Sequence, residues 1–199
     1  MQSLLSDVGS NQTSAYRYAS RTGLITLIAA GTASAGHLFA CRWSHATKVA
    51  IVTNFKASWQ QATSFAASQD VGFALHVTRA YTAAHTGGTA ATLTGDAFKL
   101  RSSYPSTSMA DIRIATTAEL TNGTHTIDTL PMLMTGYSEL AASTTRAPFS
   151  MSYPTSFGGY HGIILTQNTG LLLLNNNLMG ATGTARVYVE LEWIEKDRY

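Results

Sequence analysis

The chain has 199 residues, of which 45% are hydrophobic and only 12% are charged, and its formal net charge is +2 with neutral histidines. It is long enough to bury a core without disulfides or a metal, and one domain is expected at this length. Lysine and arginine are scattered singly, without the basic stripe that follows a phosphate backbone, so we expect no nucleic-acid partner. With so few charged residues, the surface must consist largely of uncharged polar residues. Such a surface repels partners only weakly, which suits a subunit that packs against others.

The first 21 residues are polar, have no clear period and carry the aromatic pair Tyr16 and Tyr18. We interpret Met1–Arg21 as an N-terminal arm that orders against a neighbouring subunit, and 22–199 as a single β-sandwich domain. A loosely held terminus is the alternative. The segment lacks the basic and apolar regions of a secretory signal, and the apolar run 23–30 is too short to cross a bilayer. We therefore expect folding in a reducing cytoplasm and no membrane partner.

Much of the chain alternates apolar and polar side chains with a period of two, which is typical of strands with one buried face. The predicted strands are Gly23–Ala30, His37–Trp43, Lys48–Trp59, Val71–Ala80, Asp111–Leu120, Thr124–Leu130, Ile163–Thr166, Leu171–Leu174 and Arg186–Ile194. Short loops at Ser44–Thr47 and Gln167–Gly170 indicate hairpins. Pro131–Phe157 holds three of the four prolines and is predicted as a long surface excursion. The pattern predicts an all-β protein, either an antiparallel sandwich or a barrel. We favour an antiparallel β-sandwich of jelly-roll type, which is a common solution for eight strands.

The longest clean alternation is the last strand, Arg186–Ile194. It predicts one buried face made of Val187, Val189, Leu191 and Trp193. Glu190 and Glu192 share the opposite face, where we expect them to be solvated or to meet arginine across a subunit contact.

Four consecutive leucines, Leu171, Leu172, Leu173 and Leu174, form another strand. Neighbouring side chains of a strand point to opposite faces, so both faces of this strand must be covered. Another subunit could cover the second face, and so could an overlying loop of the same chain.

Residues that carry chemistry form no recognisable motif. The histidines are His37, His45, His76, His85, His125 and His161, and no two have the spacing of metal ligands with an acidic partner. We therefore expect no metal site and no cofactor, and a cluster of histidines brought together by the fold is the alternative. Cys41 lies in an apolar run and is interpreted as a buried, inert thiol. There is no G-x-S-x-G elbow, no aligned carboxylate pair and no phosphate-binding loop, so we expect no catalytic residue.

Three segments carry a resemblance to known proteins: V-G-F-A-L-H-V-T-R-A-Y-T-A-A-H-T-G-G-T-A-A-T-L-T-G, M-A-D-I-R-I-A-T-T-A-E-L-T-N-G-T-H-T, and the closing L-T-Q-N-T-G-L-L-L-L-N-N-N with R-V-Y-V-E-L-E-W. In them the chain resembles structural proteins from the virions of tailed bacteriophages, over roughly Ser14 to Ile194. The resemblance implies a non-enzymatic β-sandwich subunit that acts by assembly in the virion, for example a capsid cement or decoration protein. Such proteins commonly sit on the shell as homotrimers and bridge copies of the major capsid protein. No functional residues carry over.

Two further hypotheses remain open from the sequence. The chain could be a tail or baseplate component that grips a host receptor or glycan with exposed aromatic residues, or an enzyme such as a glycan hydrolase. For the assembly hypothesis, the candidate subunit contacts are Leu171, Leu172, Leu173, Leu174, Glu190, Glu192, Tyr16 and Tyr18.

Overall fold

The computed structural model describes residues 14–26, 36–142, 150–153, 162–177 and 182–197. Within these residues all regular structure is β, and every pairing between strands is antiparallel. The strands form a five-stranded and a seven-stranded sheet. The predicted all-β antiparallel sandwich is thus confirmed, whereas its finer assignment as a jelly roll stays a prediction.

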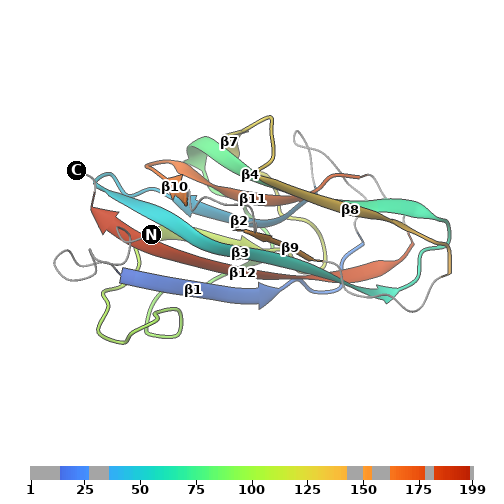
Figure 1. Ribbon diagram of the computed structural model, residues 1–199, viewed down its shortest axis with the longest axis horizontal. Coiled ribbons are helices and arrows are strands. Elements are labelled where there is room, and N and C mark those ends of the chain that lie inside the picture. The colour runs from blue at the N-terminus through green and yellow to red at the C-terminus, as the bar shows by residue number, and fades with distance from the viewer. Residues whose placement is uncertain (1–13, 27–35, 143–149, 154–161, 178–181, 198–199) are drawn as a thin grey trace, which may run out of the picture.

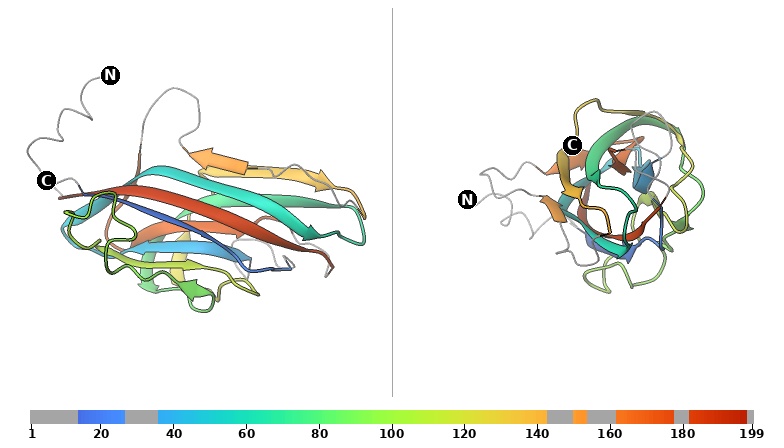
Figure 2. Two further views of the ribbon diagram at one scale, coloured as in Figure 1. Left: turned by 90° about the horizontal axis from the view of Figure 1, so that it is seen from below. Right: turned by 90° about the vertical axis from the view of Figure 1, so that its right-hand side faces the viewer.

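The smaller sheet follows the order β1 (Ser14–Arg21), β12 (Thr184–Asp197), β3 (Lys48–Thr63) and β10 (Ile163–Leu165), with β9 (Ser150–Tyr153) also paired to β3. The larger sheet follows the order β5 (Thr89–Ala90), β6 (Met109–Ile114), β2 (His37–Trp43), β11 (Thr169–Asn175), β4 (Gln69–Ala83) and β7 (Thr124–Ile127), with β8 (Leu133–Glu139) also paired to β4. In Figure 1 the long strands β12 and β3 run side by side along the length of the molecule, with the shorter β1 on the other edge of β12, and the end-on view of Figure 2 shows the sheets facing each other.

The inter-sheet core lies between the facing sides of the two sheets. Strand β12 is paired on both edges, to β1 and to β3, and its predicted buried face is confirmed because Val187, Val189, Leu191 and Trp193 are each at most 1% exposed. The period of two in β4 likewise turns Val71, Phe73, Leu75 and Val77 toward this core. Cys41 is buried in the same core, and burial raises the pKa of its thiol to about 12, as expected of an inert thiol.

The predicted N-terminal arm requires a correction. Ser14–Arg21 form strand β1, which pairs with β12 along its whole length, so they belong to the sandwich. Their alternation is hard to recognise in the sequence because the inward positions hold serine and tyrosine rather than aliphatic residues, while both alanines lie on the opposite face. The remaining residues of the interpreted arm, 1–13, lie outside the described residues.

Two predicted hairpins are wrong. Ser44–Thr47 connect β2 of the larger sheet to β3 of the smaller one, and the turn before β11 likewise follows β10 of the other sheet. Short loops therefore cross between the layers here, because a sandwich can bury two consecutive amphipathic strands on opposite walls of one core.

The predicted surface excursion at Pro131–Phe157 is also wrong in part. Strand β8 pairs with β4, and β9 pairs with β3, so this stretch adds a strand to each sheet. Its period is hard to recognise because both faces of β8 carry apolar side chains. Residues 143–149 and 154–157 of the stretch, and 27–30 of the strand predicted at Gly23–Ala30, lie outside the described residues.

Candidate functional site

The outer face of the larger sheet carries a second apolar cluster, which we call the outer-face layer. Its buried members are Ala40, Ala74, Ala115, Leu120, Leu172 and Leu174, and Ile127 packs against them. The segment 115–123, which links β6 to β7, supplies its lid. Backbone hydrogen bonds hold this lid down: the Ala115 amide donates to the Leu38 carbonyl at 2.8 Å and the Leu120 amide to the His37 carbonyl at 2.8 Å.

Three histidines from three separate segments of the chain meet in space. His37 is the first residue of β2, His85 follows the end of β4, and His125 lies in β7. The neighbouring Thr86 is fixed by a bridge to Thr121, with backbone hydrogen bonds of 3.0 and 3.1 Å. Gly123 allows the close approach of β7, because a Cβ at this position would lie 2.4 Å from the Ala83 carbonyl oxygen.

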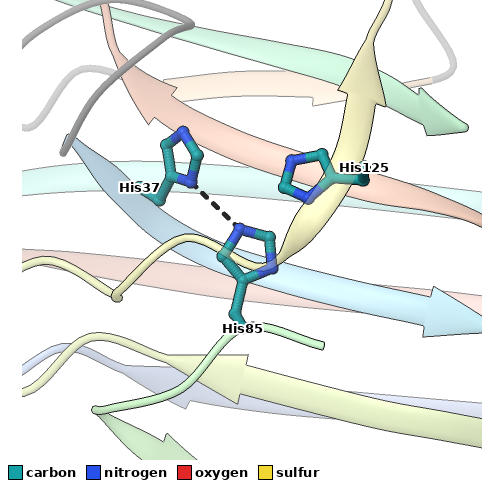
Figure 3. Close-up of side chains that lie close together, drawn as sticks. All are labelled: His37, His85 and His125. Carbon is teal, nitrogen blue, oxygen red and sulfur yellow. Dashed lines mark hydrogen bonds between the residues drawn. The ribbon is translucent and has the colours of Figure 1, made fainter. Parts of the chain in front are cut away.

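The three imidazole rings face one another (Figure 3). The Nδ1 atom of His37 lies 3.0 Å from Nε2 of His85, within hydrogen-bond distance. One ring nitrogen from each of the three residues lies within 4.8 Å of the other two. His37 is 0% and His85 is 2% exposed, whereas His125 is only partly buried and lies nearest the solvent. We call this group the three-histidine cluster.

The cluster holds its rings in the neutral form at neutral pH. Burial, followed by the neighbouring His125 and His76, lowers the pKa of His37 to about 4. Burial, followed by His37 and His125 and by the Arg113 guanidinium, lowers the pKa of His85 to about 3. Burial also lowers the pKa of His125. Neutral imidazole is the form that binds a metal ion.

Two nitrogens of the cluster lack a hydrogen-bond partner within the described part of the chain. They are Nε2 of His37 and Nδ1 of His125, and both are shielded from solvent. Leaving a buried polar atom unpaired costs about 1–3 kcal/mol. The cluster therefore opposes folding, and the packing of the layer does not explain why three histidines meet there.

Tyr81 lies beside the cluster but is not placed for acid–base chemistry. The centre of its ring is 4.6 Å from that of the His125 ring, and the Arg42 guanidinium lies 5.9 Å from the Tyr81 ring centre. Burial raises the pKa of Tyr81 well above its ordinary value, so the phenol stays protonated at physiological pH. What the arrangement offers chemically is a set of neutral nitrogen ligands.

The sequence did not reveal this cluster. The expectation that no metal site exists rested on spacing along the chain, and 48 residues separate His37 from His85. Only the pairing of β2 with its neighbours and the bridge at Thr86 brings these residues together. No local pattern in the sequence indicates this contact, because β2 and β7 are not neighbouring strands in the sheet.

The four leucines of β11 are not subunit contacts, which corrects that assignment. Each is at most 1% exposed because β11 is the inner strand between β2 and β4. Leu171 and Leu173 face the inter-sheet core, and Leu172 and Leu174 face the outer-face layer. Both faces are covered as predicted, and the same chain provides the second cover.

The two tyrosines of β1 are also turned inward, contrary to their assignment as contacts. Tyr16 is 0% exposed, stacks on Trp193 with 5.5 Å between ring centres, and donates a hydrogen bond to the Pro105 carbonyl at 3.0 Å. Tyr18 is partly buried and packs on Phe39 at 6.1 Å. They anchor the smaller sheet to the rest of the core.

Glu190 and Glu192 lie on the outer face of β12, as predicted. Glu190 is exposed and its carboxylate is 4.0 Å from the Lys56 ammonium, on the neighbouring strand β3. Whether these glutamates contact another subunit stays a prediction.

Glu195 is a buried carboxylate that the sequence analysis missed. It is 3% exposed and accepts hydrogen bonds from the Thr107 hydroxyl, from the Ser108 amide at 2.8 Å and from the Trp193 indole at 3.3 Å. It thereby ties the loop before β6 to β12. Its position two residues after the buried Trp193 was the available signal.

An apolar strip lies on the surface around β8. It consists of Leu130, Met132, Met134 and Leu140, which are 82%, 45%, 69% and 66% exposed. Met132 and Met134 alternate with Leu133, which packs against the inter-sheet core, so they project from the opposite, outer side of the larger sheet. The only charged residue between 130 and 140, Glu139, is buried.

Comparison with known proteins adds no relative to this description. No family model, no curated protein and no solved structure matches the chain. Within the described ranges, no helix is long and apolar enough to cross a membrane.

Proposed function

We propose that the chain is a non-enzymatic structural protein of a bacteriophage virion, most simply a cement or decoration subunit of the capsid. It acts through contacts with neighbouring virion proteins, the major capsid protein first among them, and as a homo-oligomer. The observation that carries this proposal is the apolar strip around β8. The resemblance of the sequence to phage structural proteins supplies the biological setting.

The strip has the properties of a contact surface. Four large apolar side chains are gathered in eleven consecutive positions, 130–140, where no charged side chain reaches the solvent. Soluble proteins scatter exposed apolar residues, and a gathered patch marks a place that another protein covers. Methionine suits such a place because its unbranched, polarizable side chain adapts to the surface it meets. A charge fraction of 12% also leaves the rest of the surface weakly repulsive.

A receptor- or glycan-binding role in the tail or baseplate is the second candidate, and one observation bears on it. An open depression of about 300 Å³ is lined by Asp70, Val71, Gly136, Tyr137, Ser138 and Asn177. It combines a carboxylate, a carboxamide and an aromatic residue, as sugar sites do. Tyr137, however, packs against the inter-sheet core, so its ring contributes to the fold and is not free to stack on a ligand. The apolar strip is therefore the stronger basis for a function.

The test compares substitutions of two apolar residues that are both more than half exposed. Met134→Asp places a charge in the strip, and Ile164→Asp places one on β10 of the smaller sheet, where Ile164 is 58% exposed. Both variants should fold like the parent, because neither side chain is buried. Each is added to particles of the encoding virus that have been stripped of this protein, and bound protein is measured by co-sedimentation.

We expect Met134→Asp to abolish or strongly reduce attachment and Ile164→Asp to leave it unchanged. If the parent, Met134→Asp and Ile164→Asp proteins attach equally well, the apolar strip is not the contact surface. Attachment only to host surface glycans, lost on Asp70→Asn, would favour the tail or baseplate role instead.

A further inference from the structure

We propose that His37, His85 and His125 form a binding site for one divalent transition-metal ion, with Zn²⁺ as the expected occupant. Each residue supplies one imidazole nitrogen, and the fourth position is open to water on the side of His125. This site is separate from the apolar strip, and the proposal does not depend on the role in the virion.

The ligand set selects the class of ion. Three neutral imidazoles suit zinc, copper and nickel, whereas magnesium and calcium require oxygen ligands. No carboxylate is among the residues that form the cluster, so the hard cations are not competitors. Three histidines with an open fourth position are a common zinc arrangement.

The geometry requires only a small adjustment. At a Zn–N distance of about 2.0–2.1 Å, two nitrogens of a tetrahedral site lie roughly 3.3 Å apart. His37 Nδ1 and His85 Nε2 already lie 3.0 Å apart, and the third nitrogen is within 4.8 Å of both partners. His125 is the least buried of the three, so a change of its rotamer can close the remaining gap.

The positions of the three residues are fixed in advance. His37 accepts the Leu120 amide through its carbonyl at 2.8 Å, and the bridge between Thr86 and Thr121 holds the residue next to His85. The pairing of Ala83 with Thr124 places β7 and thereby His125. A site assembled from rigid segments loses little entropy on binding.

Metal binding also gives the buried lone pairs of the neutral rings a partner. Within the described part of the chain Nδ1 of His125 has no hydrogen-bond partner, whereas the unpaired Nε2 of His37 is not the nitrogen that faces His85 and is not satisfied by the ion. One positive charge works against the ion, because Arg113 lies near His85. Its effect is reduced, since its guanidinium donates hydrogen bonds to Asp111 at 3.1 Å and to the Gly87 carbonyl at 3.1 Å.

The bound ion would join three separate segments of the larger sheet. His37 belongs to β2, His85 to the loop after β4 and His125 to β7. The expected consequence is a more stable layer.

The experiment uses the untagged full chain, because a polyhistidine tag would bind the same ions. The protein is treated with EDTA, dialysed and titrated at pH 7.5 with ZnCl₂ in a calorimeter, with MgCl₂ as the ion that should not bind. CoCl₂ gives a second reading, since tetrahedral cobalt absorbs visible light. The variants are His125→Gln, which alters the partly exposed ligand, and His45→Gln, which alters a histidine outside the cluster.

We expect one zinc ion per chain and a melting temperature raised by roughly 5 °C at a zinc concentration about 100 times the dissociation constant. His125→Gln should weaken binding by at least about tenfold and His45→Gln should not change it. The circular dichroism and metal-free melting temperature of each variant establish that it is folded. A parent that does not bind zinc, or a folded His125→Gln protein that binds as tightly as the parent, would overturn the proposal.

Discussion

Neighbouring leucines of strand β11 point to opposite faces of the larger sheet, and the two faces are buried in different ways. On the inner face, Leu171 and Leu173 join an extensive core in which three tryptophans and two sheets share the burial. On the outer face, Leu172 and Leu174 are covered by one connecting segment and border three neutral histidines. The inner core contributes stability through apolar area, whereas the outer-face layer combines a thin apolar cover with unsatisfied polar atoms.

This difference indicates which region is shaped by function. An all-β sandwich of this size does not need a second apolar cluster outside its sheets, nor histidines whose burial opposes folding. Where local chemistry conflicts with stability, the conflict points to a ligand or a contact. The apolar strip of β8 lies on the same outer side of the larger sheet, so both features of functional interest avoid the inter-sheet core.

The largest effect is expected from removing the same side chain on each face. Leu173→Ala in the inter-sheet core should lower the free energy of unfolding by about 4 kcal/mol, and Leu172→Ala in the outer-face layer by about 2–3 kcal/mol. Both leucines are 0% exposed, so the two changes remove equal buried groups. The thin outer-face layer can relax into the cavity that the substitution leaves, whereas the two packed sheets of the inter-sheet core cannot, so the cavity there costs more. Urea denaturation of both variants measures the difference. If Leu172→Ala lowers the free energy of unfolding more than Leu173→Ala does, the outer-face layer and not the inter-sheet core contributes more to stability.

Acid should destabilise the protein through the three-histidine cluster. In the unfolded chain a histidine titrates near pH 6.5, whereas folded His37 and His85 have pKa values of about 4 and about 3. Between these values the unfolded state binds more protons, so stability falls as the pH falls. The loss between pH 7 and pH 4 is about 3 kcal/mol for His37 by itself.

Denaturant melts in EDTA at half-unit pH steps measure this slope. A His37→Gln, His85→Gln double variant is the control, and its stability should change less between pH 6.5 and pH 4. An unchanged slope in the double variant would show that other groups cause the acid sensitivity.

The sequence predicted what depends on local alternation and missed what depends on pairing between distant strands. The buried faces of β4 and β12 follow from a period of two, and so does the need to cover both sides of the leucine strand. Which sheet each strand joins is set by long-range pairing. The two loops predicted as hairpins therefore connect strands of different sheets. The three-histidine cluster was missed for the same reason, because its members are brought together by strand register and not by spacing.

The smallest effect is expected at Glu190, on the solvent side of β12. Its carboxylate and the Lys56 ammonium are 4.0 Å apart and both side chains are 56% exposed, so the ion pair is screened by water. Glu190→Gln should change the free energy of unfolding by at most about 0.5 kcal/mol. If Glu190 instead meets an arginine of another subunit, the same change weakens attachment to particles, and the loss shrinks as salt rises. Co-sedimentation at 50 mM and 500 mM NaCl, with Glu192→Gln as the matched variant, separates these cases. A large loss of stability on Glu190→Gln in the isolated chain would show that this carboxylate stabilises the fold, contrary to what its exposure predicts.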